Sequence, residues 1–311
     1  MLDQRTTAFV FPGQGSQFVG MGAALSTRYR VARQTFEDAD GLLGFPLSRL
    51  CFEGPEEALN ATVNAQPALY VAGIAAMRVV YDVLGEEFQP ACVAGHSLGE
   101  LTALTAAGAL SFQEGLKLVR RRGEVMRDAG EHSPGGMAAL LGVELAEAEA
   151  LCADARAKTG GVLVVANDNC PGQVVIAGDE ATLMAAMAAA KRAVRLPVSI
   201  ASHSPLMNRA QAEFARALAE THFYEPVIPI IGNTQARSLQ TADEVRSELH
   251  AQLTSPVRWT DSIRTMIGMG ITTFIELGSK NVLTGLIKRI DRDMTSYVVD
   301  SPEGVAALEA L

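Results

Sequence analysis

The chain has 311 residues and a mass of 32.9 kDa, with 48% hydrophobic and 20% charged residues. This length suits one large α/β domain with a small insert, and the apolar content excludes a disordered chain. The net charge of −9 argues against nucleic acid as a main partner, because phosphate binding needs a basic face. No uninterrupted apolar run approaches the ~20 residues that span a bilayer.

The N-terminus is polar and leads directly into a strand-like run, so it does not resemble a signal peptide. The four cysteines form neither a CxxC pair nor a metal-ligand spacing. They are Cys51, Cys92, Cys152 and Cys170. We therefore expect reduced, mostly buried thiols in a cytoplasmic protein that binds no metal and no membrane.

The first part of the chain alternates short apolar runs with helical stretches. Residues 8–12 and 91–94 are too short for helices, and each run leads into a glycine, so they predict buried strands entering tight loops. Residues 101–109 resume a helical composition after the second run. Short strands alternating with helices predict a mostly parallel sheet covered on both faces.

The middle part, residues 130–200, has a different rhythm. Apolar runs and strong helix formers alternate in the order βαββαβ, which is the ferredoxin-like plan. The expected strands are 136–143, 162–166, 173–177 and 194–200, the expected helices are 144–158 and 180–192, and 167–172 is expected to be a turn. Asp179 is placed to cap the second helix. We expect this part to be a small insert in the larger domain.

The third part, residues 201–311, returns to alternating helices and strands. Residues 226–233 and 272–278 have the composition of buried strands that end in loops. The chain contains no internal repeat and no low-complexity linker.

The pentapeptide Gly95-His96-Ser97-Leu98-Gly99 has the pattern G-x-S-x-G between a predicted strand and a predicted helix. That context fits a nucleophile elbow, in which a strained turn exposes the serine hydroxyl above the sheet. The Leu98 N–H would then lie near a helix N-terminus, where it can meet a developing oxyanion. The alternative is a Gly-Ser turn that only joins a strand to a helix.

A nucleophilic serine needs a base, and the chain has five histidines. They are His96, His132, His203, His222 and His250. His203 is the best candidate because it follows an apolar strand and begins a loop, whereas His96 is expected to be structural. An ordinary loop histidine is the alternative. No acidic residue stands out between Ser97 and His203, which argues weakly against an ordinary esterase.

Two further segments are candidates for the same site. The loop Gly13-Gln14-Gly15 lacks the third glycine of a dinucleotide fingerprint, and the Gln14 N–H is better used as a second oxyanion donor. Residues 120–122 are three consecutive arginines, which usually mark a solvated helix end. One of them could instead face inward and bind a substrate carboxylate.

These motifs together resemble the malonyl-CoA:acyl-carrier-protein transacylases of fatty acid synthesis and the related polyketide synthase acyltransferases. The resemblance covers nearly the whole chain. The matching blocks are residues 11–17, 66–69, 95–100, 122–123, 171–178, 202–203, 252–253, 256–257 and 282–286. It implies an α/β-hydrolase-like catalytic domain of residues 1–129 and 201–311, with the ferredoxin-like insert at 130–200.

The resemblance also implies a role for each matching residue. Ser97 would be the nucleophile, His203 its general base, and Gln252 the residue that orients the histidine through its backbone carbonyl. Arg122 would bind the malonyl carboxylate. The remaining matches are the backbone oxyanion donors, Gln14 and Leu98, and a pocket residue of less defined role, Gln66.

By the same resemblance, the chain would transfer a malonyl group from CoA to the phosphopantetheine thiol of an acyl carrier protein. The route would be a malonyl-serine intermediate and ping-pong kinetics. It would need no metal or redox cofactor, because malonyl-CoA and the carrier protein are substrates. We expect a cytoplasmic monomer.

Several alternatives stay open from the sequence. An acyl-thioester hydrolase on the same fold would need the same serine and histidine but would have no use for a carboxylate clamp. An acyltransferase serving a polyketide synthase or malonate decarboxylase differs only in context, and Ser202 before His203 favours the free-standing fatty-acid type. A non-catalytic, carrier-tethering subunit would not need the set Ser97, His203 and Arg122.

The carrier partner poses a charge problem, because carrier proteins are usually acidic and this chain is acidic too. Docking would need a local basic patch. The candidates are Lys191, Arg192, Arg195, Lys280, Lys288 and Arg289. Scattered solubilising charges are the alternative for each of them.

Overall fold

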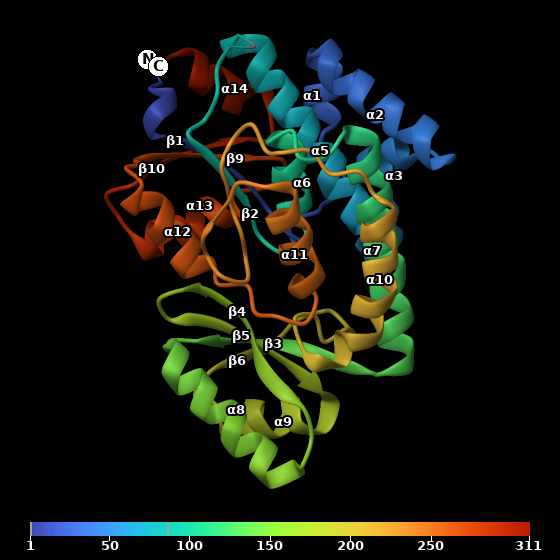
Figure 1. Cartoon of the computed structure of the whole chain (residues 1–311), viewed down its shortest axis with the longest axis vertical. Coiled ribbons are helices and arrows are strands. Elements are labelled where there is room, and N and C mark those ends of the chain that lie inside the picture. Colours follow the sequence, from blue (N-terminus) through green and yellow to red (C-terminus); the bar gives the residue numbers. More distant parts are fainter. Residues whose placement is uncertain (1, 86) are drawn as a thin grey trace.

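The computed structural model of the chain describes residues 2–85 and 87–311 and contains two β-sheets. Figure 1 shows the larger sheet in the upper part of the molecule among most of the helices, and the smaller sheet below it beside α8 and α9. Each sheet has its own hydrophobic cores.

The larger sheet has six strands in the order β10-β9-β1-β2-β7-β8. Their bounds are Thr7–Phe11 (β1), Cys92–Gly95 (β2), Ile230–Ile231 (β7), Ser238–Leu239 (β8), Thr273–Leu277 (β9) and Thr295–Val299 (β10). Neighbouring strands are parallel except β7 and β8, which are antiparallel. The predicted mostly parallel α/β sheet is confirmed.

The central strand β1 shows why this sheet is buried on both faces. Its alternate side chains point to opposite sides, so Phe9 and Phe11 join one core while Ala8 and Val10 join the other. All five residues of β1 are buried. Burial on both faces explains why the strand reads as a continuous apolar run rather than an alternating one.

Twelve helices accompany the larger sheet in the described residues. Their bounds are Ala23–Arg28 (α1), Arg30–Leu43 (α2), Leu47–Glu53 (α3), Glu56–Asn60 (α4), Thr62–Leu84 (α5), Gly99–Ala106 (α6), Phe112–His132 (α7), Asn208–Glu220 (α10), Ala242–Gln252 (α11), Trp259–Gly268 (α12), Val282–Ile290 (α13) and Pro302–Glu309 (α14). Short 3₁₀ turns occupy Gln4–Thr6 and Pro205–Met207.

Helix α5 is long and apolar enough by length and composition to cross a membrane. Its most apolar window is 72% buried inside the structure, between the sheet and the surrounding helices. Such burial is typical of a central core helix, whose hydrophobicity is satisfied within the protein. The four cysteines are also buried and free, as predicted.

The smaller sheet is antiparallel, with the strand order β4-β5-β3-β6. The bounds are Gly135–Leu141 (β3), Leu145–Thr159 (α8), Leu163–Cys170 (β4), Gln173–Asp179 (β5), Glu180–Ala189 (α9) and Ala193–Arg195 (β6). Helices α8 and α9 pack with one face of the sheet into a single core. The element order agrees with the predicted βαββαβ pattern.

Three predicted boundaries are wrong. The turn expected at 167–172 is mostly strand, because β4 continues through two bulges to Cys170 and only the residues after it turn. The strand expected at 194–200 ends at Arg195, close to Pro197, which has no N–H for a ladder. The strand expected at 226–233 is only Ile230–Ile231, since Pro226 and Pro229 interrupt it.

Strand β4 connects the two sheets. Its backbone pairs with residue Val257 of the larger unit, through Asp168 N–H to Val257 O at 2.9 Å and Val257 N–H to Ala166 O at 2.9 Å. The guanidinium of Arg289 on α13 adds hydrogen bonds to Gln173 Oε1 at 2.8 Å and to Pro171 O at 2.9 Å. These contacts hold the smaller sheet at a fixed position beside the larger unit.

The predicted cap of α9 gives a test of the local structure. The Asp179 carboxylate accepts hydrogen bonds from Thr182 N at 3.0 Å and from Val162 N at 2.5 Å. We expect Asp179→Ala to lower the free energy of unfolding by about 1 to 2 kcal/mol, because two backbone donors lose their acceptor. Urea denaturation followed by circular dichroism measures this change.

The matched control is Asp243→Ala in the first turn of α11, where the side chain is 94% exposed and pairs with Arg246 on the same helix. We expect this variant to unfold within a few tenths of a kcal/mol of the wild type. Equal losses in both variants would contradict the capping role of Asp179.

Candidate active site

The pentapeptide 95–99 forms a sharp turn between β2 and α6. Strand β2 ends at Gly95, α6 begins at Gly99, and Ser97 between them has a φ of 52°. A Cβ on Gly95 would lie 1.9 Å from the Gly99 carbonyl carbon, and one on Gly99 would lie 2.1 Å from Phe11 O. Both glycines are therefore required by close backbone approach, and the strained serine is held by its surroundings.

Asn233 holds this turn from the neighbouring strand. It follows β7, is fully buried, and accepts the Ser97 N–H on Oδ1 at 2.7 Å. Its Nδ2 donates to Gly95 O at 2.7 Å. No motif marks Asn233 as functional, and its position at the carboxyl end of a predicted strand is the one signal that points to it.

Ser97 and His203 meet as predicted. Ser97 Oγ lies 2.7 Å from His203 Nε2 although 105 residues separate them in the chain. His203 Nδ1 lies 2.9 Å from Gln252 O and 3.1 Å from Ser255 O. Carbonyl oxygens only accept, so Nδ1 carries the proton and Nε2 is free to accept one from the serine.

No carboxylate bonds to His203 in the described part of the chain. Two neutral carbonyls take the place that an acid holds in a Ser-His-Asp triad. Burial and the positive charge of Arg122 lower the pKa of His203 from 6.5 to about 3. The imidazole is therefore neutral near pH 7, the state that a general base requires.

Arg122 on α7 is the inward-facing arginine of the three. Its side chain is only 1% exposed, and Nη2 donates to Ser97 Oγ at 3.2 Å and to Gln252 Oε1 at 3.0 Å. Nη1 donates to Gln66 Oε1 at 2.9 Å. Nε is buried and has no hydrogen-bond partner among residues 2–85 and 87–311. Burial lowers the pKa of Arg122 to about 10, so the group remains a cation at neutral pH.

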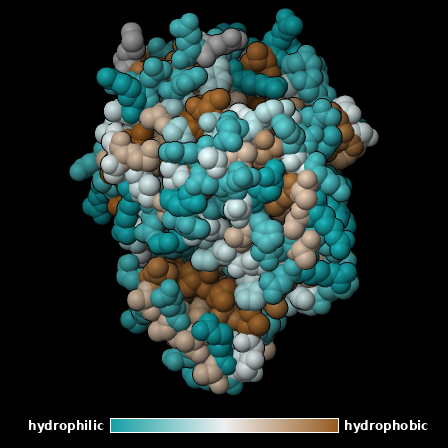
Figure 2. Space-filling model, viewed as in Figure 1, coloured by the Kyte–Doolittle hydropathy of each residue, from teal (hydrophilic) through white to brown (hydrophobic). Residues whose placement is uncertain are grey.

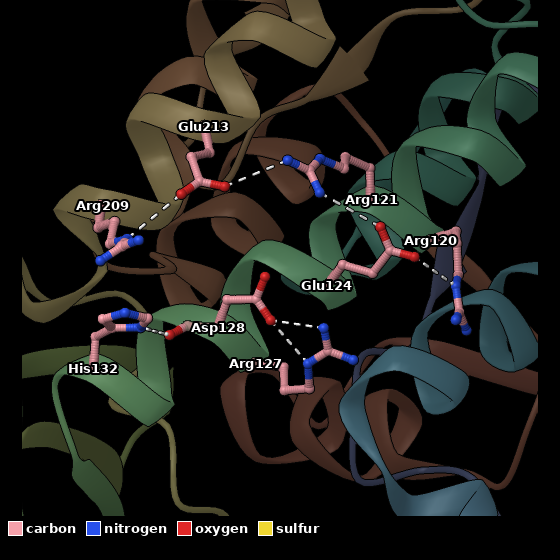
Figure 3. Close-up of polar contacts among 8 residues, drawn as sticks. All are labelled: Arg120, Arg121, Glu124, Arg127, Asp128, His132, Arg209 and Glu213. Carbon is pink, nitrogen blue, oxygen red and sulfur yellow. Dashed lines mark hydrogen bonds and ion pairs between the residues drawn. The ribbon is translucent and has the colours of Figure 1, made fainter.

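The other two arginines point away from the site. Figure 3 shows Arg120 and Arg121 in a chain of ion pairs that continues through Glu124 to Glu213 on α10. His132 lies apart on the same helix, with Nδ1 2.7 Å from Asp128 O. These arginines lie in the middle of α7, so the solvated helix end that such a run usually marks is not found here. Arg120 also donates to Val63 O at 2.9 Å.

Gln252 connects His203, Arg122 and Ser97. Its backbone carbonyl meets His203, its Oε1 accepts from Arg122, and its Nε2 donates to Ser97 O at 2.9 Å and to Glu100 Oε2. The predicted contact with the histidine is present. The side-chain contacts were not foreseen, because nothing in the local sequence shows where a glutamine amide points.

Gln14 and Leu98 lie in loops that follow the adjacent parallel strands β1 and β2. Within the described part of the chain, the N–H of neither residue donates a hydrogen bond to a protein acceptor. Gln14 lines the cavity beside Ser97, and its side chain bonds to Thr62 Oγ1 at 3.2 Å. Two free N–H groups beside a serine are what an oxyanion hole requires.

A cavity of about 540 Å³ opens onto these groups between the two sheets. Such a volume is typical of small-molecule sites. One wall is polar and includes Gln14, Ser97, Arg122 and His203. The smaller sheet, the segment after it and α13 contribute apolar lining residues, which are Met137, Ala139, Val175, Leu196, Val198, Leu283 and Leu286. The smaller sheet also contributes the polar residues Asn167, Asn169 and Gln173. Figure 2 shows brown surface gathered over the smaller unit.

His96 and Asn169 join the two walls. His96 Nε2 lies 2.8 Å from Asn169 Oδ1 on β4, and its ring packs edge-on against Trp259. Burial lowers the pKa of His96. These contacts support the predicted structural position of His96 beside the nucleophile.

The comparisons with known proteins agree with this geometry. A family described as "Acyl transferase domain" matches residues 8–299. The chain belongs to this acyl transferase family. It is 41% identical over 305 residues to the malonyl CoA-acyl carrier protein transacylase of Escherichia coli K12, covering 96% of this chain and 97% of that protein. The resemblance drawn from the sequence motifs is confirmed.

Solved structures extend the similarity of this acyltransferase to three dimensions. The malonyl-CoA:acyl carrier protein transacylase of Xanthomonas oryzae pv. oryzae matches with a TM-score of 0.94 and 42% identity, over 100% of this chain and 99% of that chain. A malonyl-transacylase in complex with its type II polyketide synthase acyl-carrier protein matches at 0.93 and 38% identity, over 98% and 99% of the two chains.

The low pKa of His203 predicts the pH dependence of Ser97 reactivity. We expect sulfonylation of Ser97 by phenylmethylsulfonyl fluoride to lose rate on the acid side only well below pH 6.5. In Arg122→Met the acid limb moves to higher pH, because the positive charge that lowers the histidine pKa is gone. The rate of adduct formation, followed by mass spectrometry across pH, measures the acid limb of the wild type and of the variant.

Arg121→Met is the matched control, since this arginine lies on the same helix and faces Glu124 and Glu213 instead of the site. Its profile should coincide with that of the wild type. A wild-type acid limb centred near pH 6.5 would show that the site does not depress the pKa of His203.

Proposed function

We propose that this acyltransferase moves a malonyl group from coenzyme A to the phosphopantetheine thiol of an acyl carrier protein. The observation that carries the proposal is the buried guanidinium of Arg122, whose Nη2 lies 3.2 Å from Ser97 Oγ and whose hydrogen-bond partners among the described residues are all neutral. Its Nε has no partner in the part of the chain described above. The free carboxylate of a malonyl group supplies the anion that this cation lacks.

In the proposed first half-reaction, Ser97 Oγ attacks the thioester carbonyl carbon of malonyl-CoA. His203 Nε2 takes the hydroxyl proton as the new C–O bond forms. The N–H groups of Gln14 and Leu98 stabilise the tetrahedral oxyanion, each by roughly 3 kcal/mol if they match other oxyanion holes. The C–S bond then breaks, His203 returns the proton to the CoA sulfur, and a malonyl-serine ester remains.

In the second half-reaction, the thiol of the carrier's phosphopantetheine arm attacks the ester. His203 accepts the thiol proton and then gives it to Ser97 Oγ as the C–O bond breaks. The same groups serve both directions, so the scheme is ping-pong and needs no metal or redox cofactor. The two half-reactions exchange one thioester for another.

Arg122 also separates this proposal from the hydrolase alternative. A hydrolase of uncharged acyl groups would leave a buried cation unpaired next to its ester, which is costly. A carboxylate held by Arg122 fixes the malonyl ester in one pose, which favours attack by a positioned thiol over attack by water. Malonyl transfer is therefore the better fit to the site.

We also propose the finer description of the fold. The strand order β4-β5-β3-β6 supports a ferredoxin-like unit at residues 130–200, inserted in an α/β-hydrolase-like domain of residues 1–129 and 201–311. The turn at Ser97 between a parallel strand and a helix supports the α/β-hydrolase-like description of the larger domain. We further propose that the protein acts as a cytoplasmic monomer.

The carrier protein is proposed to dock at cations on two segments that also line the cleft. Lys191 and Arg192 precede the segment that contributes Leu196, and Lys288 lies on α13, which contributes Leu286. These three cations are exposed and form no ion pair with any of the described residues. Arg195 and Arg289 are less available, because they bond to Glu180 and to the β4–β5 turn. Lys280 lies against Gln17 O and Phe18.

Intact-protein mass spectrometry tests the proposed reaction. We expect malonyl-CoA to add one malonyl group to the wild type, and a phosphopantetheinylated carrier protein to remove it and become malonylated. Ser97→Ala should form no adduct, because the nucleophile is absent.

Other outcomes have definite meanings. Decay of the adduct to free malonate in the presence of several carrier proteins would favour the hydrolase. Labelling by an uncharged acyl-CoA but not by malonyl-CoA would contradict the role proposed for Arg122.

The docking proposal predicts an effect on one half-reaction only. We expect the triple variant Lys191→Glu, Arg192→Glu and Lys288→Glu to slow transfer to the carrier about tenfold or more, because the surface then repels an acidic partner. Formation of the malonyl-serine ester from malonyl-CoA should stay near the wild-type rate.

Lys158→Glu is the matched control, since this exposed lysine lies on α8, which packs on the other face of the smaller sheet. It should leave both half-reactions unchanged. Equal loss of both half-reactions in the triple variant would refute the docking role.

A further inference from the structure

Glu100 is a buried carboxylate that the proposed reaction does not use. It lies in the first turn of α6, three residues after the nucleophile, and its side chain is 0% exposed. Oε1 accepts the Asn233 N–H at 3.0 Å, and Oε2 accepts a hydrogen bond from Gln252 Nε2. Asn233 and Gln252 are the residues that hold Ser97 N–H and Arg122, respectively.

The two carboxyl oxygens of Glu100 both serve as hydrogen-bond acceptors. Each faces an N–H group that can only donate, from the Asn233 backbone and from the Gln252 amide. Burial, and then the nearby Glu248, raise the pKa of Glu100 well above its ordinary value, and the two donors and Arg122 offset only part of that rise. The hydrogen bonds therefore fix the position of the carboxyl group between Asn233 and Gln252.

The Glu100 carboxyl group also fixes the orientation of the Gln252 amide. Two acceptors, Glu100 Oε2 and Ser97 O, face the NH₂ end of that amide. The carbonyl end must therefore point to Arg122, whose Nη2 it accepts at 3.0 Å. If the amide turned over, its NH₂ group would face the guanidinium, and two donors would meet.

We propose that Glu100 is a positioning residue for acyl-group selection, which holds Gln252 so that Arg122 faces the acyl pocket beside Ser97. This inference rests on the proposed malonyl transfer. Glu100 is joined to Arg122 through the Gln252 amide and makes no hydrogen bond to the guanidinium itself. A direct carboxylate partner would occupy the guanidinium, whereas a carboxyl group that acts through Gln252 leaves it open to the substrate carboxylate.

The substitution Glu100→Gln tests this arrangement at nearly constant volume. A glutamine has one acceptor and one donor end, so either Asn233 N–H or the Gln252 amide must then face a donor. We expect the preference for malonyl-CoA over acetyl-CoA to fall about tenfold, the size of effect when a charge-assisted hydrogen bond is lost. Arg122→Met provides the ratio for an enzyme without the cation.

Glu248→Gln is the matched control. Glu248 is a second buried carboxylate in the same region, and it accepts from Thr234 N and Thr234 Oγ1, each at 2.6 Å, rather than from Gln252. We expect it to lose stability but to keep the wild-type preference between the two acyl groups.

The measurement is a competition between equimolar malonyl-CoA and acetyl-CoA, with the ratio of the two Ser97 adducts read early by intact-protein mass spectrometry. This ratio does not depend on the fraction of protein that is folded. A merely structural role would lower both adducts together and leave the ratio unchanged, which would overturn the inference. If Glu100→Gln yields no folded protein, Glu100→Asp is measured instead, and an unchanged ratio there overturns the inference as well.

The wild-type result distinguishes failure of the proposed function from failure of the role of Glu100. A wild type that shows no preference for malonyl-CoA contradicts the proposed function itself. A wild type that prefers malonyl-CoA, beside a Glu100→Gln variant with the same preference, contradicts only the role of Glu100.

Discussion

The structure is organised around one costly feature, a guanidinium cation buried beside a serine. An arginine in the protein interior is tolerated only when its charge and donors are satisfied. Three neutral oxygens accept hydrogen bonds from Arg122, from Gln66 on α5, Gln252 on α11 and Ser97 after β2, while its Nε has no partner among the described residues. These elements are far apart in the chain, so the cation position depends on the packing of the whole larger unit.

The turn at Ser97 depends on close backbone contact in the same way. Helix α6 approaches β1 so closely that the Gly99 position has no room for a side chain. Asn233 then holds the strained serine through its N–H, and β4 of the smaller sheet meets His96 and Val257 on either side of the site. The smaller sheet therefore supports the nucleophile as well as forming the apolar wall of the cavity.

Much of this arrangement could be predicted from the sequence because the signals are local. Short apolar runs gave β1, β2 and β9, and Asp179 marked the start of α9. The strands near prolines were predicted too long. Composition alone does not show where a proline removes the backbone N–H that pairs a strand with its neighbour. Strand β10 was missed, because only its last residue is fully buried and its apolar signal is weak. The residues around Ser97 were found through motifs, whereas Asn233 and the side-chain bonds of Gln252 arise from tertiary packing that no local pattern contains.

The neutral partners of His203 follow from the same buried cation. A carboxylate at Nδ1 would raise the histidine pKa and would be a second anion close to Arg122, in competition with an incoming carboxylate. Carbonyls from Gln252 and Ser255 fix the tautomer without adding a charge. The Glu100 carboxyl group lies behind the Gln252 amide and makes no hydrogen bond to the guanidinium. A site that must bind an anionic acyl group and still deprotonate a serine is better built with its guanidinium free of a carboxylate of its own.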